Sequence, residues 1–141
     1  MWGMMVALAS GALMSLQGVF NTEVTKHSSI WASAGWVQLT AFITCVILYF
    51  ATGRGEIMGM FSMDRKYMLL GGVMGAFITW TVIKSMDDLG PARATLLIVV
   101  TQILVSYFIE VFGLFGVEKA GFEWKKLIGA AVAIAGIVIF K

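Results

Sequence analysis

The stretch TLLIVVTQILVSYFIEVFGLF, residues 95–115, decides the fold class because it contains a single charged side chain, that of Glu110. A helix needs about 20 mostly apolar residues to cross the core of a bilayer, with about 17 as the short limit. The stretch meets this length, and it is longer than a barrel strand and lacks its alternation of polar and apolar residues. Because a backbone in lipid must satisfy its own hydrogen bonds, we expect a transmembrane helix here.

The rest of the chain has the same character. Of its 141 residues 60% are hydrophobic and 13% are charged, and its mean hydropathy is +0.91. An ordinary soluble domain is about 25% charged, so a soluble monomer is excluded. Together with residues 95–115, the predicted spans are residues 2–21, 30–52, 67–83 and 124–140. We therefore expect an all-α integral membrane protein with five transmembrane helices, forming a single membrane domain over residues 1–141.

The last predicted span is the shortest. It depends on Lys125 and Lys126 at one end and Lys141 at the other, whose long side chains would reach to the two membrane interfaces. A single cysteine, Cys45, allows no intramolecular disulfide. The basic residues form no stripe of the kind that binds nucleic acid. With no phosphate-binding loop and no set of cysteine and histidine ligands, the sequence predicts neither an enzyme nor a bound cofactor or metal.

Positive residues predict the orientation of a membrane protein. The side of the membrane that holds the N-terminus carries six of them and the opposite side four, which favours a cytoplasmic N-terminus. So small an excess also leads to the hypothesis that the chain inserts in both orientations. The two groups are Arg54, Arg65, Lys66, Lys119, Lys125 and Lys126, and Lys26, Lys84, Arg93 and Lys141.

Small residues recur at helical spacing in the third and fifth predicted spans. Such rows let the backbones of two helices approach closely, so we interpret them as packing positions rather than as part of a substrate path. The residues are Gly71, Gly72, Gly75, Gly129, Ala133 and Gly136.

Polar side chains lie in register on two spans. Gln17 and Asn21 share a face of the first span, where they either bond a neighbouring helix or line a polar cavity. On the fourth span Gln102, Ser106 and Glu110 follow one another at four-residue steps. These five side chains are our candidates for a solute path.

Glu110 is the key candidate because it lies inside an apolar run. A carboxylate at such a depth is costly unless it is protonated, hydrated or paired, and burial would favour the protonated form that a proton-exchanging site uses. The alternative is a structural ion pair with a lysine or arginine of another helix, for example Lys84 or Lys119, or placement near the interface. Trp80 adds a further candidate, which either stacks on a solute or is an ordinary core side chain.

Four segments carry a family resemblance: GALMSLQGVFN (11–21), LGGVMGAF (70–77), TQILVSYFIEVFGLFG (101–116) and LIGAAVAIAGIVIF (127–140). They resemble the YdcZ-type inner-membrane transporters of the drug/metabolite transporter superfamily, which more often have an aspartate where Glu110 stands. The resemblance implies a bacterial inner-membrane protein with a five-helix half of the ten-helix EamA-like architecture. The matching positions are Gln17, Asn21, Gly71, Gly72, Gly75, Gln102, Gly113, Gly116 and Gly129.

Five helices with polar faces on the first and the fourth do not easily enclose a central path. Alternating access is commonly built from two inverted repeats, which an antiparallel homodimer would supply from one sequence. We therefore predict a small secondary transporter, and an exporter, of a metabolite or drug-like solute, with proton coupling through Glu110. The alternatives are a non-transporting subunit that assembles with an unlike partner in the bilayer, and a small channel.

Overall fold

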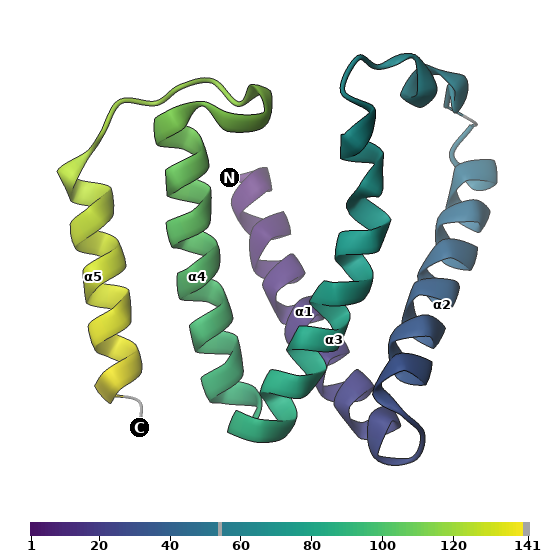
Figure 1. Cartoon of the computed structure of the whole chain (residues 1–141), viewed down its shortest axis with the longest axis horizontal. Coiled ribbons are helices and arrows are strands. Elements are labelled where there is room, and N and C mark those ends of the chain that lie inside the picture. Colours follow the sequence, from purple (N-terminus) through teal and green to yellow (C-terminus); the bar gives the residue numbers. More distant parts are fainter. Residues whose placement is uncertain (54, 140–141) are drawn as a thin grey trace. The chain divides into compact units, whose positions relative to one another are not determined.

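The computed structural model describes residues 1–53 and 55–139. Within this part of the chain there are five α-helices and no strand, which confirms the all-helical class (Figure 1). Arg54, which contributes to the charge bias, lies outside the described residues, as do Phe140 and Lys141 at the end of the last predicted span. The helices are α1 (Trp2–Lys26), α2 (Ile30–Ala51), α3 (Gly71–Leu89), α4 (Pro91–Phe112) and α5 (Trp124–Ile139).

Within the described residues, four helical segments are long and apolar enough to cross a membrane: α1, α2, α4, and the segment Lys66–Leu89, in which a 3-10 turn leads into α3. In its described part α5 has 16 residues. At 1.5 Å per residue this is about 24 Å, somewhat less than the hydrocarbon core of about 30 Å. A fifth crossing by α5 therefore stays a prediction.

Two helices, α1 and α3, extend beyond the C-terminal ends of the apolar stretches. α1 continues past Asn21 to Lys26, whose ammonium lies 2.7 Å from the Glu23 carboxylate. α3 continues past Ile83 to Leu89, and there Lys84 pairs with Asp88 at 2.8 Å. Hydropathy marks where a chain leaves lipid, whereas a helix continues as long as its polar turns remain satisfied.

α4 is displaced toward the N-terminus relative to the predicted span at residues 95–115. It begins at Pro91, which needs no N–H partner in the first turn, and Gly90 occupies the N-cap position. It ends at Phe112 because Gly113 adopts a left-handed conformation with φ of 63°. The helix end thus lies close to Glu110, a placement that the apolar run did not indicate.

The described chain divides into two compact units, Met1–Asp88 and Leu89–Lys141. In the first, the Ser33 hydroxyl donates to the Asn21 carbonyl at 3.0 Å and joins α2 to α1. A Cβ added to Gly18 of α1 would lie 2.5 Å from Met86 Cε of α3, so the end of the Met86 side chain lies against Gly18. In the second unit α4 packs against α5. Whether the chain forms a single membrane domain stays a prediction.

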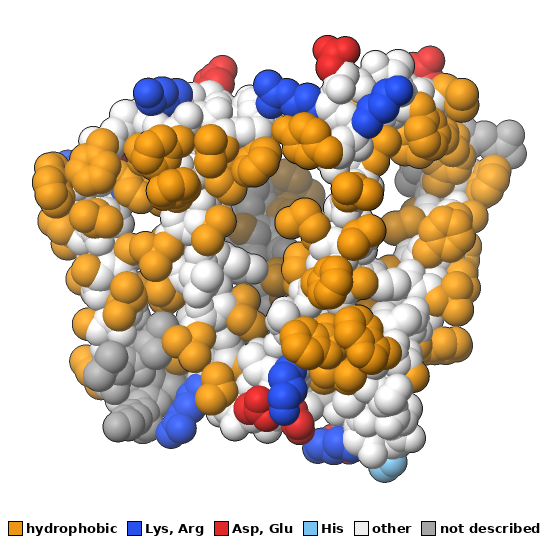
Figure 2. Space-filling model, viewed as in Figure 1, with side chains coloured by type: hydrophobic (Ala, Val, Ile, Leu, Met, Phe, Trp, Pro, Cys, Tyr) orange, Lys and Arg blue, Asp and Glu red, His pale blue; other side chains and the backbone are white. Residues whose placement is uncertain are grey.

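Most large apolar side chains are exposed in both units. Phe42 is 66% exposed and Phe112 57%, whereas Ile83 is among the few that are fully buried. Hydrophobic side chains cover much of the helix flanks, and the charged side chains gather near helix ends (Figure 2). This is the distribution expected of helices that face lipid.

Candidate functional site

The second unit contains a groove between α4 and α5 with a volume of about 490 Å³, which we call the α4/α5 groove. It brings together three of the predicted candidates, Gln102, Ser106 and Glu110, because their four-residue spacing places them on one face of α4. The full lining is Val99, Gln102, Ile103, Ser106, Tyr107, Glu110, Lys126, Gly129 and Ala130.

Glu110 lies in the last turn of α4, and the chain that follows folds back onto that turn. The Glu110 carbonyl accepts hydrogen bonds from the N–H groups of Gly113 at 3.3 Å and Ala120 at 2.9 Å. A Cβ on Gly113 would lie 3.2 Å from Lys119 Cβ, and the positive φ of Gly113 also disfavours any other residue. The connection from α4 to α5 is therefore anchored at Glu110.

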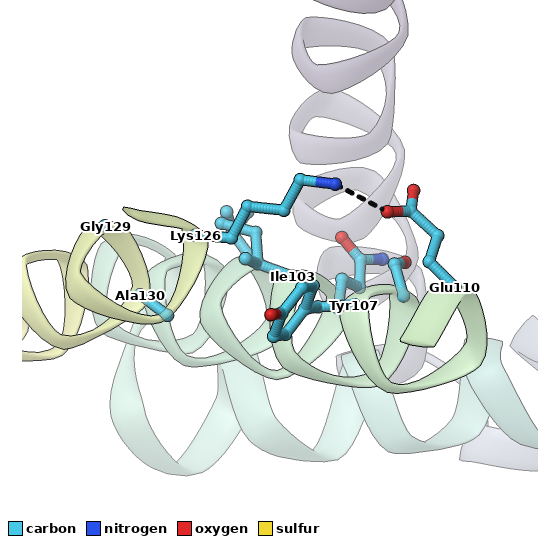
Figure 3. A pocket seen from close by; sticks show the side chains of 9 residues that line it. Ile103, Tyr107, Glu110, Lys126, Gly129 and Ala130 are labelled. Carbon is cyan, nitrogen blue, oxygen red and sulfur yellow. Dashed lines mark hydrogen bonds and ion pairs between the residues drawn. The ribbon is translucent and has the colours of Figure 1, made fainter. Parts of the chain in front are cut away.

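The Glu110 carboxylate forms an ion pair with Lys126, with 3.1 Å between Oε2 and Nζ. Lys126 reaches across from α5 to the end of α4 (Figure 3). The partner is neither of the two lysines considered from the sequence. Lys84 pairs with Asp88 within α3, and Lys119 makes no ion pair among the residues that the structure describes.

Tyr107 and Glu123 complete this cluster, which consists of Tyr107, Glu110, Glu123 and Lys126. The Tyr107 hydroxyl accepts a hydrogen bond from the Glu123 N–H at 2.8 Å and donates to the Glu123 carbonyl at 3.1 Å. Lys126 Nζ lies 3.7 Å from the Glu123 carboxylate and 5.7 Å from the centre of the Tyr107 ring. Tyr107, Glu123 and Lys126 are not among the residues that the sequence predicts for this site.

A helical-wheel argument that starts from Glu110 could have found one of these residues, Tyr107. Tyr107 precedes Glu110 by three positions, and Glu123 precedes Lys126 by three, so each pair lies on one side of a helix or of a helix start. The two pairs meet because of the way the connection between α4 and α5 folds. No helical spacing in the sequence predicts that fold.

The charged side chains of the cluster are only partly covered. Glu110 is 44% exposed, Lys126 41% and Glu123 55%. All three charged side chains are therefore accessible from outside the protein. The two carboxylates and one ammonium leave a formal charge of −1 at this end of the groove.

The first unit contains a groove of about 530 Å³ between α1 and α2, which we call the α1/α2 groove. It contains the other two amides of the prediction, Gln17 and Asn21. Asn21 is 8% exposed, and its side-chain amide has no hydrogen-bond partner within the described residues. The full lining is Leu13, Leu16, Gln17, Phe20, Asn21, Val37, Thr40, Ala41, Thr44 and Cys45.

Trp80 lines neither groove. Its ring stacks on that of Trp31, with 6.0 Å between the ring centroids and 14° between the planes. Phe77 contacts Trp31 edge-on at 6.4 Å. This aromatic group joins α3 to the start of α2, so the structure supplies a protein partner for the face of Trp80.

The predicted packing residues differ in their surroundings. A Cβ on Gly75 would lie 2.9 Å from Gln38 Nε2, so the end of the Gln38 side chain of α2 lies against Gly75 of α3. Ala133 is half-buried in α5. A Cβ would meet nothing within 4 Å at Gly71, Gly72, Gly129 or Gly136.

Comparison with known proteins adds a family to this geometry. Residues 2–139 match the family described as "Putative inner membrane exporter, YdcZ". The chain belongs to the DMT_YdcZ family. No curated protein and no solved structure matches the chain.

Family membership confirms the resemblance inferred from the sequence, and with it the membrane and transport character of the chain. The chain, whose described part contains four long apolar helical segments, is a multi-pass protein of the inner membrane. The family's description names an exporter and not an enzyme. Within the described residues no group of three or more histidine, cysteine or acidic side chains is placed to hold a metal ion.

Proposed function

We propose that the chain is a small secondary transporter that exports a small solute by alternating access, and that the α4/α5 groove is its solute site. The observation that carries this proposal is the Glu110–Lys126 contact of 3.1 Å at the edge of a groove that also holds Gln102 and Ser106. An ionisable side chain on a helix of an inner-membrane exporter is a functional candidate by default.

Each side chain has a role that follows from its chemistry. Glu110 binds either a proton or a cationic group of the solute. A protonated carboxyl group no longer has the charge that attracts a cation, so the binding of one favours the release of the other. The Gln102 amide both donates and accepts, and it orients the uncharged polar part of the solute. Ser106 lies between them on α4 and supplies a hydroxyl.

The working unit in this proposal is an antiparallel homodimer. Each copy crosses the membrane five times and forms half of a ten-helix transporter. The Asn21 amide, which has no hydrogen-bond partner within the described residues, supports this, since an interhelical hydrogen bond to a second copy would satisfy it. The small excess of positive residues on one side supports insertion in both orientations. Family membership favours a transporter over a subunit without transport activity and over a channel.

Proton flux in proteoliposomes tests the proposal and does not require the solute to be identified first. Purified protein is reconstituted in vesicles that contain the pH dye pyranine, and amino acids, sugars, polyamines and organic cations are added one at a time. We expect at least one class of compound to change the internal pH, with a rate that saturates as its concentration rises.

Protein-free vesicles give the background. The proposal fails if no compound class exceeds that background while the protein remains folded and dimeric. Conduction that does not saturate and needs no exchange of solute for protons would instead identify a channel.

A further inference from the structure

The Lys126 ammonium occupies a three-sided cation site. Two sides are carboxylates, with Glu110 Oε2 at 3.1 Å and Glu123 Oε1 at 3.7 Å, and the third is the Tyr107 ring at 5.7 Å from its centre. Carboxylates and an aromatic face are the groups that bind organic cations. The site is therefore built for a cation, and a side chain of the protein itself fills it.

The charge balance of the cluster favours a second cation. Two carboxylates face one ammonium, so a cation that enters brings the formal charge of the cluster from −1 to zero. Lys126 is 41% exposed and reaches Glu110 through a flexible four-carbon stem. Because Glu123 is already 3.7 Å from Nζ, the lysine keeps an acidic partner when it leaves Glu110.

We propose that Lys126 is a tethered competitor of the solute, and that the solute is a primary amine or another small organic cation whose charged group displaces Lys126 from Glu110. This inference rests on the proposed function and names the class of substrate. The walls of the groove, with Val99, Ile103 and Ala130, would hold the apolar part of such a cation.

The test measures binding to the purified full-length chain in detergent, by calorimetric titration with phenethylamine, which is a cation at neutral pH. Lys126→Gln should tighten binding roughly five- to tenfold, because it removes a competitor that occupies the site for most of the time. Lys125→Gln is the matched control. It removes the same charge from the neighbouring position, where no ion pair is present among the described residues, and should leave the affinity unchanged.

Two further variants keep the test decisive if Lys126→Gln fails to fold. Lys126→Arg should weaken phenethylamine binding, because the guanidinium fork holds a carboxylate through two hydrogen bonds. Glu110→Gln should abolish it. A structural ion pair alone predicts that Lys126→Gln binds phenethylamine no better than the native chain, and this result would overturn the proposal.

Phenylpropionate, an anion of similar size, serves as the counter-probe. Tighter binding of phenylpropionate than of phenethylamine to the native chain would also overturn the proposal. The ammonium of phosphatidylethanolamine has the same chemistry, so the titration is repeated in nanodiscs with and without this lipid. We expect equal affinities, and a loss of amine binding in its presence would identify the headgroup as the occupant instead.

This experiment fails separately from the flux measurement. Proton flux driven by an uncharged solute, with no binding of amines, would leave the transporter in place and refute the tethered lysine. Amine binding in the predicted order of variants, without flux for any compound, would support the cation site and refute transport.

Discussion

The two grooves differ in how their polar groups are satisfied. In the α4/α5 groove Glu110 finds its counter-ion on the next helix, at 3.1 Å. In the α1/α2 groove the Asn21 amide has no hydrogen-bond partner within the described residues although the residue is 8% exposed. The ionisable group of the first groove is therefore paired within one chain, whereas the Asn21 amide of the second groove is open to a partner from outside it. We infer that the first binds the solute and the second contributes to assembly.

Replacing Glu110 tests this division with the largest expected effect. Glu110→Gln keeps the size of the side chain but removes the charge, so solute-driven proton flux should fall to the level of protein-free vesicles. Dimerisation should change little, because the ion pair joins two helices of the same chain. Pyranine fluorescence measures the flux, and light scattering in detergent measures the mass of the assembly.

Glu118→Gln is the control for this variant. Glu118 lies in the connection between α4 and α5 and makes no ion pair among the described residues, so its loss should leave the flux unchanged. Native rates of flux in Glu110→Gln would contradict the role of the α4/α5 groove. Loss of the dimer in this variant would contradict the division of labour between the grooves.

Replacing Asn21 should have a smaller effect, and it should change the dimer affinity rather than the flux. If the amide bonds a second copy, Asn21→Leu should weaken the homodimer roughly 3- to 30-fold, which corresponds to about 0.6–2 kcal/mol for an interhelical hydrogen bond in a membrane. Amine binding in the α4/α5 groove should remain. Fluorescence energy transfer between labelled copies, diluted stepwise in lipid, measures the dimer affinity.

Thr101→Val is the control, because the Thr101 hydroxyl donates to the Leu97 carbonyl of its own helix at 2.9 Å and needs no outside partner. An unchanged dimer affinity in Asn21→Leu would show that the α1/α2 groove has another use. The contrast between the grooves would then rest on the ion pair alone.

The sequence predicts the helices well and the site in part. An apolar stretch such as residues 95–115 has one stable form in lipid, so its helix follows from composition. The stripe of Gln102, Ser106 and Glu110 follows from the helical period, and the structure places all three in one groove. In both cases the prediction depends only on the residues of a single helix.

The partner of Glu110 could not be predicted in this way. Which lysine meets it depends on how the connection from α4 to α5 folds, and that connection contains a left-handed Gly113 and a positive φ at Phe115. Hydropathy describes neither conformation. Lys126 is one of two adjacent lysines, and from the sequence both serve equally well as anchors at a membrane interface.

Replacing Tyr107 should have the smallest effect. It tests whether the α4/α5 groove depends on Tyr107 to hold Glu123 near Lys126. Tyr107→Phe keeps the ring beside Lys126 but removes the two hydrogen bonds that the hydroxyl makes with the Glu123 backbone, at 2.8 and 3.1 Å. At about 1 kcal/mol for a typical hydrogen bond, the loss should appear as a small fall in melting temperature. The control is Tyr67→Phe. The Tyr67 hydroxyl makes no hydrogen bond within the described residues, so this variant should show no fall in melting temperature.

Because the Tyr107 hydroxyl holds Glu123 near Lys126, Tyr107→Phe should also let Lys126 pair with Glu110 more of the time and thus weaken phenethylamine binding severalfold. A lower melting temperature with unchanged amine affinity would show that Tyr107 only joins the two helices, and that Glu123 is not the second partner of the lysine.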